Sequence, residues 1–262
     1  MTILEKILSY KKKEVDERKK IKPLKTLLNE GDRKGEALSL VRSLTEVGSS
    51  GLIAEFKTMS PSRGLINKSA DVEIVTRKYL EAGAAAISVL TDTGFFGGSF
   101  DDIRRARAVN NCPILQKDFI IDEYQIAEAF LAGADVILLI AAALDHAKVK
   151  SLSAVAKNYG LEVILEIHSK DELSMLTGDI DMAGINNRNL DTFHTDFRTS
   201  LSLAEHIPGD FVKISESGIC DADTILKLRE AGFSGFLVGE AFMQEADPGE
   251  ACRKLIEQLK KK

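Results

Sequence analysis

Eight short apolar runs recur along the chain from residue 52 onward, and this regularity limits the possible folds more than any other feature. Amphipathic segments of helical character separate the runs, for example residues 122–131 and 221–231. Strands that alternate with helices indicate βαβ units and a parallel sheet. Eight such units favour a closed (β/α)8 TIM barrel over an open sheet, and about 250 residues are typical of that fold. The predicted strands cover residues 52–56, 85–90, 113–119, 136–141, 162–168, 181–187, 211–217 and 235–242.

A repeated glycine supports closure of the barrel. Gly83, Gly133, Gly178 and Gly232 each precede a predicted strand, and the intervals between them are close to two βα units. A glycine at this place can end the preceding helix in a left-handed conformation and turn the chain into the strand. No Gly-x-Gly-x-x-Gly follows the first predicted strand, which disfavours a dinucleotide-binding fold.

The first fifty residues differ from the rest of the chain. Apolar residues at helical spacing predict one helix over residues 2–20 and another over 36–47. Pro23 lies between them and would break a continuous helix. Because this segment is too short to bury a core of its own, we expect a single domain, residues 1–262, made of an N-terminal helical extension, residues 1–50, and a barrel, residues 51–262.

The balance of charges excludes some classes of partner. The chain of 262 residues has a formal net charge of -5 and a pI of about 5.6. This charge argues against nonspecific binding of nucleic acid, which a basic surface favours. No apolar run approaches the ~20 residues of a membrane span, so no membrane association is expected. The N-terminal segment is too charged for a signal peptide.

Cysteine and histidine usage indicates neither a disulfide framework nor a metal site. Cys112, Cys220 and Cys252 form no Cys-x-x-Cys pair, and we expect them to be packing residues. The four histidines lack the spacing of metal ligands. A reducing cytoplasm fits this composition, so a cytoplasmic location without a metal is expected.

Polar and ionisable residues gather at the ends of the predicted strands, where active sites of such barrels form. An ionisable side chain within an apolar strand is costly unless it is paired. A structural ion-pair network explains any one of these residues well, but a set at the same end of the barrel favours an active site. The set comprises Glu55, Lys57, Lys117, Glu166, Asn186, Asn187, Arg188, Glu216 and Ser217.

The last two strands carry a signal for phosphate binding. The seventh predicted strand runs into Ser217-Gly218, and the eighth runs into Gly239-Glu240-Ala241, which is expected to open a short helix. Barrels of this type often bind phosphate there, on backbone N–H groups that glycine makes accessible.

Several segments match one family in order along the chain. They combine Glu-x-Lys-x-x-Ser-Pro-Ser, Lys-Asp-Phe, Asn-x-Arg and Ser-Glu-Ser-Gly on the predicted strands, and the N-terminal ILEKIL fits the same family. Together they resemble the indole-3-glycerol-phosphate synthases over essentially the whole chain. The segments are IAEFKTMSPSRG (53–64), SVLTDTGFFGGS (88–99), LQKDFI (115–120), LEIH (165–168), GINNRNLDTF (184–193), ISESGI (214–219) and LVGEAFM (237–243).

The resemblance implies a substrate, a reaction and a simple set of partners. The substrate would be the small phosphorylated molecule 1-(2-carboxyphenylamino)-1-deoxyribulose 5-phosphate. Ring closure, loss of carbon dioxide and loss of water would give indole-3-glycerol phosphate, in tryptophan biosynthesis. The family needs no cofactor, and a monomer is expected.

The resemblance also implies catalytic roles. Lys117 matches the family's general acid, and we expect burial and nearby cations to lower the pKa of its ammonium group. Glu166 matches the base of the later steps, with His168 beside it in a supporting role. Glu55 and Lys57 match residues that hold the substrate and take part in proton transfer. Positioned acids and bases typically contribute ~10²–10⁴-fold each.

Binding residues follow from the same resemblance. Arg188 suits the substrate carboxylate, because its planar fork donates two parallel hydrogen bonds. Asn186 and Ser217 match polar groups around the sugar and the ring. The remaining expected substrate contacts are Ser60, Lys57, Gly218, Gly239 and Glu240 around the phosphate; Phe96, Phe119, Leu138 and Leu190 around the aromatic ring; and Pro61 and Glu216 within the shared motifs.

Two features depart from the family pattern. Met59, after Thr58, stands where members often have a basic or small residue, and the Thr93-Gly94 pair in the loop after the second strand is unusual. Neither change removes a residue with an expected catalytic role. Both affect the expected shape of the pocket entrance.

Three other functions are compatible with parts of this pattern. Phosphoribosylanthranilate isomerases share the expected fold and phosphate site but use a cysteine near the first strand, where this chain has Glu55 and Lys57. A Schiff-base aldolase needs a nucleophilic lysine, for which only Lys117 or Lys213 would serve. A non-catalytic phosphometabolite-binding protein is the third alternative, since fold does not dictate function.

Overall fold

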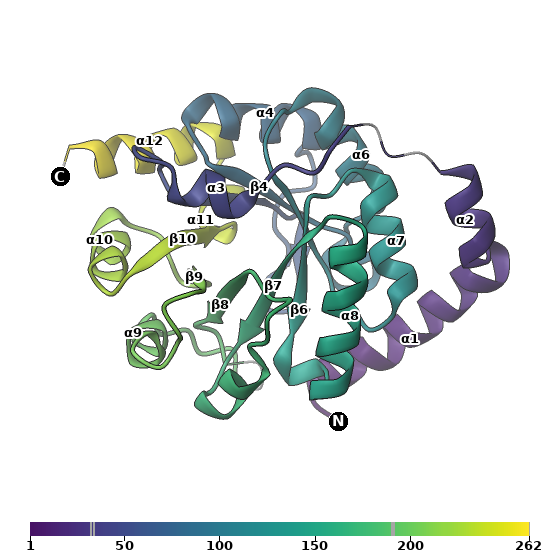
Figure 1. The fold of residues 1–262 in the computed structure, drawn as a ribbon. Helices are drawn as coiled ribbons and strands as arrows, with labels where there is room; N and C mark the ends of the chain where they lie inside the picture. Colours follow the sequence, from purple (N-terminus) through teal and green to yellow (C-terminus); the bar gives the residue numbers. More distant parts are fainter. Residues whose placement is uncertain (32, 34, 190–191, 262) are drawn as a thin grey trace.

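The computed structural model describes residues 1–31, 33, 35–189 and 192–261, and it contains a closed barrel (Figure 1). Within these residues, eight parallel strands pair in the order β1-β10-β9-β8-β7-β6-β5-β4, and β4 pairs with β1 to close the ring. The predicted (β/α)8 barrel is therefore confirmed. The barrel strands are β1 (Leu52–Phe56), β4 (Ala86–Leu90), β5 (Ile114–Lys117), β6 (Val136–Ile140), β7 (Glu162–Ile167), β8 (Met182–Asn186), β9 (Val212–Glu216) and β10 (Phe233–Val238).

Helices connect the strands around the outside of the barrel. Most begin at an aspartate or serine whose side chain accepts hydrogen bonds from the first-turn N–H groups, as Asp71 does for α4 and Asp221 for α10. The outer helices are α4 (Val72–Ala82), α6 (Phe100–Val109), α7 (Glu123–Ala132), α8 (His146–Asn158), α9 (Arg198–Ala204), α10 (Ala222–Glu230) and α12 (Pro248–Lys260).

A two-stranded hairpin and several short helices lie in the loops at the carboxyl ends of the strands. The hairpin of β2 (Met59–Ser60) and β3 (Gly64–Leu65) follows β1 and was not predicted. The last predicted strand was placed too far along the chain, because β10 ends at Val238 and the expected short helix α11 (Glu240–Met243) follows. The other short helices are α5 (Thr93–Phe96), η1 (Ala141–Ala143) and η2 (Lys170–Met175).

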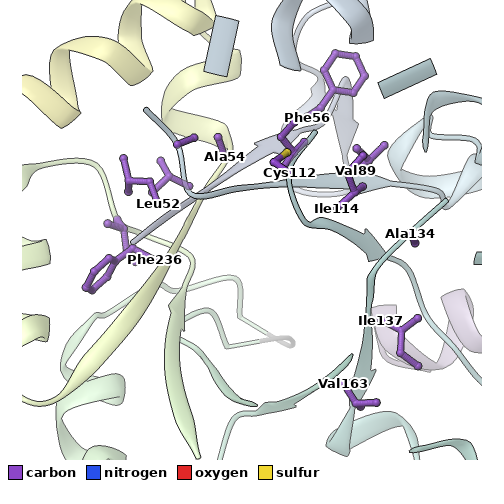
Figure 2. Close-up of a cluster of buried hydrophobic side chains, with 14 of the residues drawn as sticks. Leu52, Ala54, Phe56, Val89, Cys112, Ile114, Ala134, Ile137, Val163 and Phe236 are labelled. Carbon is purple, nitrogen blue, oxygen red and sulfur yellow. The ribbon is translucent and has the colours of Figure 1, made fainter. Parts of the chain in front are cut away.

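Two apolar layers form the core. Inward-facing residues such as Ile53, Leu115 and Ile164 fill the barrel interior. Alternate residues of the same strands pack outward against the helices, and Figure 2 shows part of this outer layer around Leu52 and Ile114. Burial on both faces explains why the strands are nearly continuous apolar runs.

The glycine repeat holds at three of its four positions. Gly83, Gly133 and Gly232 have φ values of 102°, 96° and 86°, in the left-handed region that favours glycine. Gly178 does not adopt a positive φ, so this part of the prediction was wrong. The reason is that Gly178 lies within a turn after the 3-10 helix η2, closed by the Ile180 N–H donating to the Thr177 carbonyl, so it has no α-helix to end.

The N-terminal extension contains one helix more than predicted. The first predicted helix is confirmed as α1 (Ile3–Ile21), and the other is the shorter α3 (Leu40–Thr45). Between them lies α2 (Leu24–Glu30), which begins directly after Pro23 and packs on α7. Pro23 separates α1 from α2, as predicted for a residue that breaks a continuous helix. It is compatible with the start of α2, because the first N–H groups of a helix have no acceptor within that helix.

The extension covers both ends of the barrel. At the amino ends of the strands, α3 inserts Leu40 and Leu44 into the interior cluster. The N–H of Leu40 donates to the Glu162 carboxylate at 2.8 Å at the start of β7. At the opposite end, α1 lies against the loops that follow β4 and β5, where Lys11 contacts Asp92 and Asp118.

Lys11 fastens α1 to the barrel through a buried ion cluster. Its Nζ atom lies 2.8 Å from Glu14, 2.8 Å from Asp92 and 2.9 Å from Asp118, and its side chain is 0% exposed. The same aspartates organise the loops, since Asp92 caps α5 and Asp118 accepts a hydrogen bond from Thr91. The cluster therefore joins the extension to two loops at the mouth of the barrel.

We propose that residues 1–50 and 51–262 unfold as one domain, and that Lys11 is the main link between them. Lys11→Met should lower the free energy of unfolding by about 3–5 kcal/mol, because it leaves Asp92 and Asp118 buried without a cation. Urea unfolding followed by circular dichroism and by tyrosine fluorescence measures this loss. The two probes should give one coincident transition in the wild-type protein.

The matched control is Lys19→Met, on the same helix. Lys19 pairs with Asp122 at 2.6 Å, but its side chain is 37% exposed. Its loss should therefore cost less than about 1 kcal/mol. Equal effects of the two substitutions would contradict the special role of Lys11.

Candidate active site

A cavity of about 540 Å³ opens at the carboxyl ends of the barrel strands, a size suited to a small-molecule substrate. Its lining combines polar strand ends with an apolar rim. One expected residue, Leu190, lies outside the described residues. The expected site residues that line the cavity are Glu55, Lys57, Ser60, Pro61, Phe96, Lys117, Phe119, Glu166, Asn186, Arg188, Glu216, Ser217, Gly218, Gly239 and Glu240.

Leu138, which is expected to contact the aromatic ring, lies deeper in the barrel than the other expected site residues, and that contact stays a prediction. Leu138 is fully buried in the interior cluster below the cavity and is not among the residues that line it. Ile140, two residues further along β6, points to the same side of the strand and lines the cavity instead. The sequence pattern identified the correct face of β6 but not the depth at which the cavity begins.

Lys117 lies at the centre of the polar part of the site. Its Nζ atom is 2.8 Å from Glu166 Oε2 and 3.3 Å from Glu216 Oε2. These residues come from β5, β7 and β9, whose inward-facing positions converge at the axis of the barrel. Asn186 donates to the other oxygen of Glu166 at 3.0 Å, and His168 Nε2 lies 3.3 Å from that oxygen.

The pKa of Lys117 is shifted in the direction opposite to the expected one. Burial alone lowers this pKa, but the surrounding carboxylates of Glu166, Glu216 and Glu55 outweigh burial and raise it above its usual value. The expected neighbours were cations, whereas the actual neighbours are anions. Lys117 is therefore firmly protonated in the substrate-free site.

The two carboxylates beside Lys117 differ from each other. Burial raises the pKa of both, but at Glu166 the attraction of Lys117 and contacts with His168 and Asn186 prevail, so its pKa falls well below the usual range. At Glu216, burial raises the pKa to about 7, because Lys117 offsets it only in part and Glu166 repels the second charge. Apart from the ion pair of Oε2 with Lys117, neither oxygen of Glu216 has a hydrogen-bond partner among the described residues. Glu216 is therefore the carboxylate beside Lys117 that changes its charge near neutral pH.

Two glycines make room for the carboxylates. A Cβ atom on Gly184 would lie 2.5 Å from Glu216 Oε1, and one on Gly239 would overlap Glu55. Both glycines are therefore required by close packing against a carboxylate of the site rather than by backbone conformation. Glu55 is buried and accepts a hydrogen bond from Lys57 Nζ at 2.6 Å, which forms a second ion pair at the mouth.

The end of β8 orients several groups at once. Asn186 Oδ1 accepts a hydrogen bond from the N–H of Arg188 at 3.0 Å, so the arginine and the amide are held together. Asn187 donates to the carbonyl oxygen of Ser217 at 3.0 Å. This contact supports Ser217 in a left-handed conformation, with φ of 67°, which non-glycine residues rarely adopt and which often marks a functional site.

Arg188 reaches across the mouth to the opposite loops. Its Nη1 donates to Ser62 at 3.1 Å, and its Nη2 donates to Glu240 at 3.2 Å. Arg63 also contacts Glu240, from Nε to Oε1 at 3.0 Å. The substrate-free site thus holds both arginines on one carboxylate.

Several residues that line the cavity were not predicted from the sequence. Ile3, Leu4 and Ile7 of α1 form part of its apolar wall, which helical periodicity showed to be apolar without revealing what it covers. Arg63 was not predicted as a site residue. Cys112 and Cys252 are buried in the core as expected, but Cys220 is exposed and lines the cavity, so the packing role predicted for it was wrong.

Two further properties concern the described part of the chain only. It contains no group of three or more His, Cys, Asp or Glu side chains placed to hold a metal ion. None of its helices is both long and apolar enough to cross a membrane.

Comparison with known proteins points to one family. The family model described as indole-3-glycerol phosphate synthase matches residues 4–255. A protein of that name from Bacteroides thetaiotaomicron is 48% identical over 257 residues, which covers 98% of each chain. Another from Laribacter hongkongensis is 43% identical and covers 97% of this chain and 98% of the relative.

Solved structures with low sequence identity share the fold alone. The 3-hexulose-6-phosphate synthase of Salmonella typhimurium superposes with a TM-score of 0.63 at 16% identity, covering 80% of this chain and 99% of that chain. A chain of the tryptophan synthase complex of Pyrococcus furiosus gives a TM-score of 0.58 at 16% identity, with coverage of 82% and 99%.

Glu216, the second carboxylate beside Lys117, is expected to lower the free energy of unfolding when it is ionised. Because the pKa of Glu216 rises from 4.5 to about 7 on folding, the folded state binds the extra proton between these pH values, and stability falls as pH rises through them. Glu216→Gln should therefore stabilise the protein at about pH 8, by up to about 3 kcal/mol. The gain should shrink toward about pH 5 in urea unfolding experiments.

Glu166→Gln is the control with the opposite sign. The lowered pKa of Glu166 means that its ionised form contributes stability above its unfolded pKa and loses it at lower pH. This substitution should destabilise the protein at about pH 8. A destabilising Glu216→Gln at that pH would contradict the difference between the two carboxylates.

Proposed function

The chain belongs to the indole-3-glycerol phosphate synthase family, and from this premise we propose how its side chains divide the work of the reaction. The protein is a carboxy-lyase of tryptophan biosynthesis. It converts 1-(2-carboxyphenylamino)-1-deoxyribulose 5-phosphate into indole-3-glycerol phosphate by ring closure, decarboxylation and dehydration. The observation that carries the assignment of roles is the Lys117 ammonium group between Glu166 and Glu216 in the cavity.

In ring closure, Lys117 acts as the general acid. The aromatic carbon that bears the carboxylate attacks the ketone carbon, and Lys117 transfers a proton to the ketone oxygen, which becomes a hydroxyl group. The raised pKa keeps the proton on Lys117 until the substrate arrives. As negative charge develops on the ketone oxygen, it competes with Glu166 and Glu216 for the ammonium group in a site shielded from water, where such interactions are strong.

The later steps need the carboxylates. The substrate carboxyl group leaves as carbon dioxide, and its bonding electrons return to the ring. The hydroxyl group then leaves as water after it gains a proton from the Lys57 ammonium group, and Glu166 removes the proton whose loss completes the aromatic indole. The lowered pKa of Glu166 keeps it ionised and ready to act as a base. Lys57 and Glu55, paired at 2.6 Å, hold the substrate and relay protons beside it.

Substrate binding uses the rim of the cavity. Arg188 binds the substrate carboxylate, and Asn186 and Ser217 contact the sugar and ring atoms. Phe96 and Phe119, whose ring centroids lie 6.0 Å apart, enclose the aromatic ring. The phosphate and the adjoining rim are assigned to Lys57, Ser60, Pro61, Glu216, Gly218, Gly239 and the backbone N–H of Glu240.

The cellular setting is a further part of the proposal. The protein acts on this substrate as a cytoplasmic monomer and without a cofactor. Three free cysteines, two of them buried, support a reducing compartment. Lys213, the other candidate for an aldolase nucleophile, donates to the Ala204 carbonyl at 2.7 Å and is not among the residues that line the cavity.

The direct test of the reaction is spectroscopic. The purified protein is mixed with the carboxyphenylamino-deoxyribulose phosphate in metal-free, cofactor-free buffer, and indole fluorescence is followed. A rise in fluorescence supports the proposed activity. A folded protein that binds the substrate without turnover would support the non-catalytic alternative.

Lys117→Ala should reduce turnover by at least ~10²-fold, because it removes the ammonium group that contacts Glu166 and protonates the ketone. Substrate binding should be largely retained, as measured by calorimetry. Lys213→Ala is the matched control, since it removes a partly buried lysine outside the cavity. Near-normal turnover in the Lys117 variant would remove it from the role of general acid.

Glu166→Gln should slow the steps after decarboxylation. Rapid quenching should then reveal a cyclised species that has lost carbon dioxide but not water. Product formation should fall by about 10²-fold or more, the usual contribution of a positioned base. Unchanged kinetics would refute the late role of Glu166.

A further inference from the structure

We propose that Arg63 is a phosphate-binding residue whose place in the substrate-free site is held by Glu240, so that the substrate phosphate displaces the Glu240 side chain. This inference rests on the proposed function and adds a binding residue to it. Arg63 lies at the tip of the β2–β3 hairpin, and neither its charge nor its position in the sequence marked it as a site residue.

The first support is the geometry of one carboxylate between two arginines. Glu240 Oε1 accepts from Arg63 at 3.0 Å, and Oε2 accepts from Arg188 at 3.2 Å. The contact of Arg188 with Ser62 at 3.1 Å adds a second link to the hairpin. Glu240 thus occupies the position in which a tetrahedral anion with several acceptor oxygens would bind the guanidinium group of Arg63, and it also holds Arg188, which is assigned to the substrate carboxylate.

The second support is the charge of the cavity. Among the described residues that line it, four are cations and five are carboxylates, and every cation already contacts a carboxylate. The substrate brings a carboxylate and a phosphate, and the phosphate alone carries about -1.5 to -2. Binding therefore requires that at least one protein carboxylate gives up its cation. The charged lining residues are Lys57, Arg63, Lys117, Arg188, Glu55, Asp118, Glu166, Glu216 and Glu240.

Glu240 is the carboxylate that can move at the lowest cost. Glu55, Glu166 and Glu216 are almost fully buried, so turning away would leave their charges without water or a cation. Asp118 is tied to buried Lys11. The side chain of Glu240 is 23% exposed at the rim, where water can solvate it after displacement.

The assigned phosphate position also requires this movement. The proposed function places the phosphate at the backbone N–H groups of Gly239 and Glu240, within reach of the same residue's carboxylate. Two anions cannot share this space without strong repulsion. When the Glu240 side chain turns to solvent, Arg63 loses its partner, and its side chain, 64% exposed, is free to contact the phosphate. The hairpin then stays attached to the rim through the ligand instead of through Glu240.

The test compares two variants that should act in opposite directions. Arg63→Gln should raise KM about 10-fold and raise the inhibition constant of inorganic phosphate by a similar factor, with kcat changed less than about 2-fold. Glu240→Gln keeps the shape of the side chain but removes the competing charge, so inorganic phosphate should bind about 3-fold more tightly or better. Calorimetry with inorganic phosphate measures the same affinities without turnover.

Arg198→Gln is the matched control. Arg198 is also exposed, at 78%, and also pairs with a neighbouring carboxylate, that of Asp196 at 2.6 Å, but it is not among the residues that line the cavity. It should leave KM and phosphate affinity unchanged. Equal urea midpoints of the variants and the wild-type protein confirm that each variant is folded.

Two results would overturn the proposal. Phosphate affinity unchanged by Arg63→Gln would exclude the direct contact, and weaker phosphate binding by Glu240→Gln would show that Glu240 supports the site instead of competing for it. The calorimetric readout keeps these results separate from the reaction itself. Wild-type protein that binds phosphate as expected but does not turn over the substrate would refute the proposed function and not the phosphate contact.

Discussion

The ion cluster of Lys117, Glu166 and Glu216 sets the conditions that the rest of the structure must satisfy. A closed barrel brings inward positions of alternate strands to a common axis, and charged side chains placed there lose most of their hydration. They remain ionised only if opposite charges lie within contact distance, as Lys117 and Glu166 do at 2.8 Å. The apolar interior below and Gly184 beside Glu216 keep this cluster dry and closely packed, which strengthens each charge interaction.

A second buried cluster extends the same constraint to the N-terminal extension. Lys117 and Asp118 are neighbours in sequence, and Asp118 binds Lys11 of α1 while Lys117 binds the carboxylates in the barrel. The end of β5 therefore carries both the proposed general acid and the aspartate that anchors the helix lining the cavity. Any shift of α1 is transmitted to the residue next to Lys117, so the extension is part of the active-site scaffold as well as of the stability of the fold.

The sequence predicted features that depend on local periodicity, and missed those that depend on convergence of distant segments. Strand alternation identified the inward-facing residues Glu55, Lys117 and Glu166, because the period of two holds within each strand. It did not reveal the depth of the cavity, below which Leu138 lies and which Ile140 of the same strand face lines. The direction of the Lys117 pKa shift depends on how many carboxylates from other strands reach it, which no local pattern records.

The paired charges of the substrate-free site bear on selectivity as well as on catalysis. A neutral molecule of the right shape would have to enter without replacing any protein carboxylate, and Glu240 would stay on Arg63 and Arg188 across the entrance. When an anionic substrate binds, its phosphate and carboxylate replace Glu240 as partners of Arg63 and Arg188. Both arginines therefore stay paired with an anion throughout. Discrimination then comes from the Glu240 side chain, which leaves the entrance only when a ligand anion replaces it on the arginines.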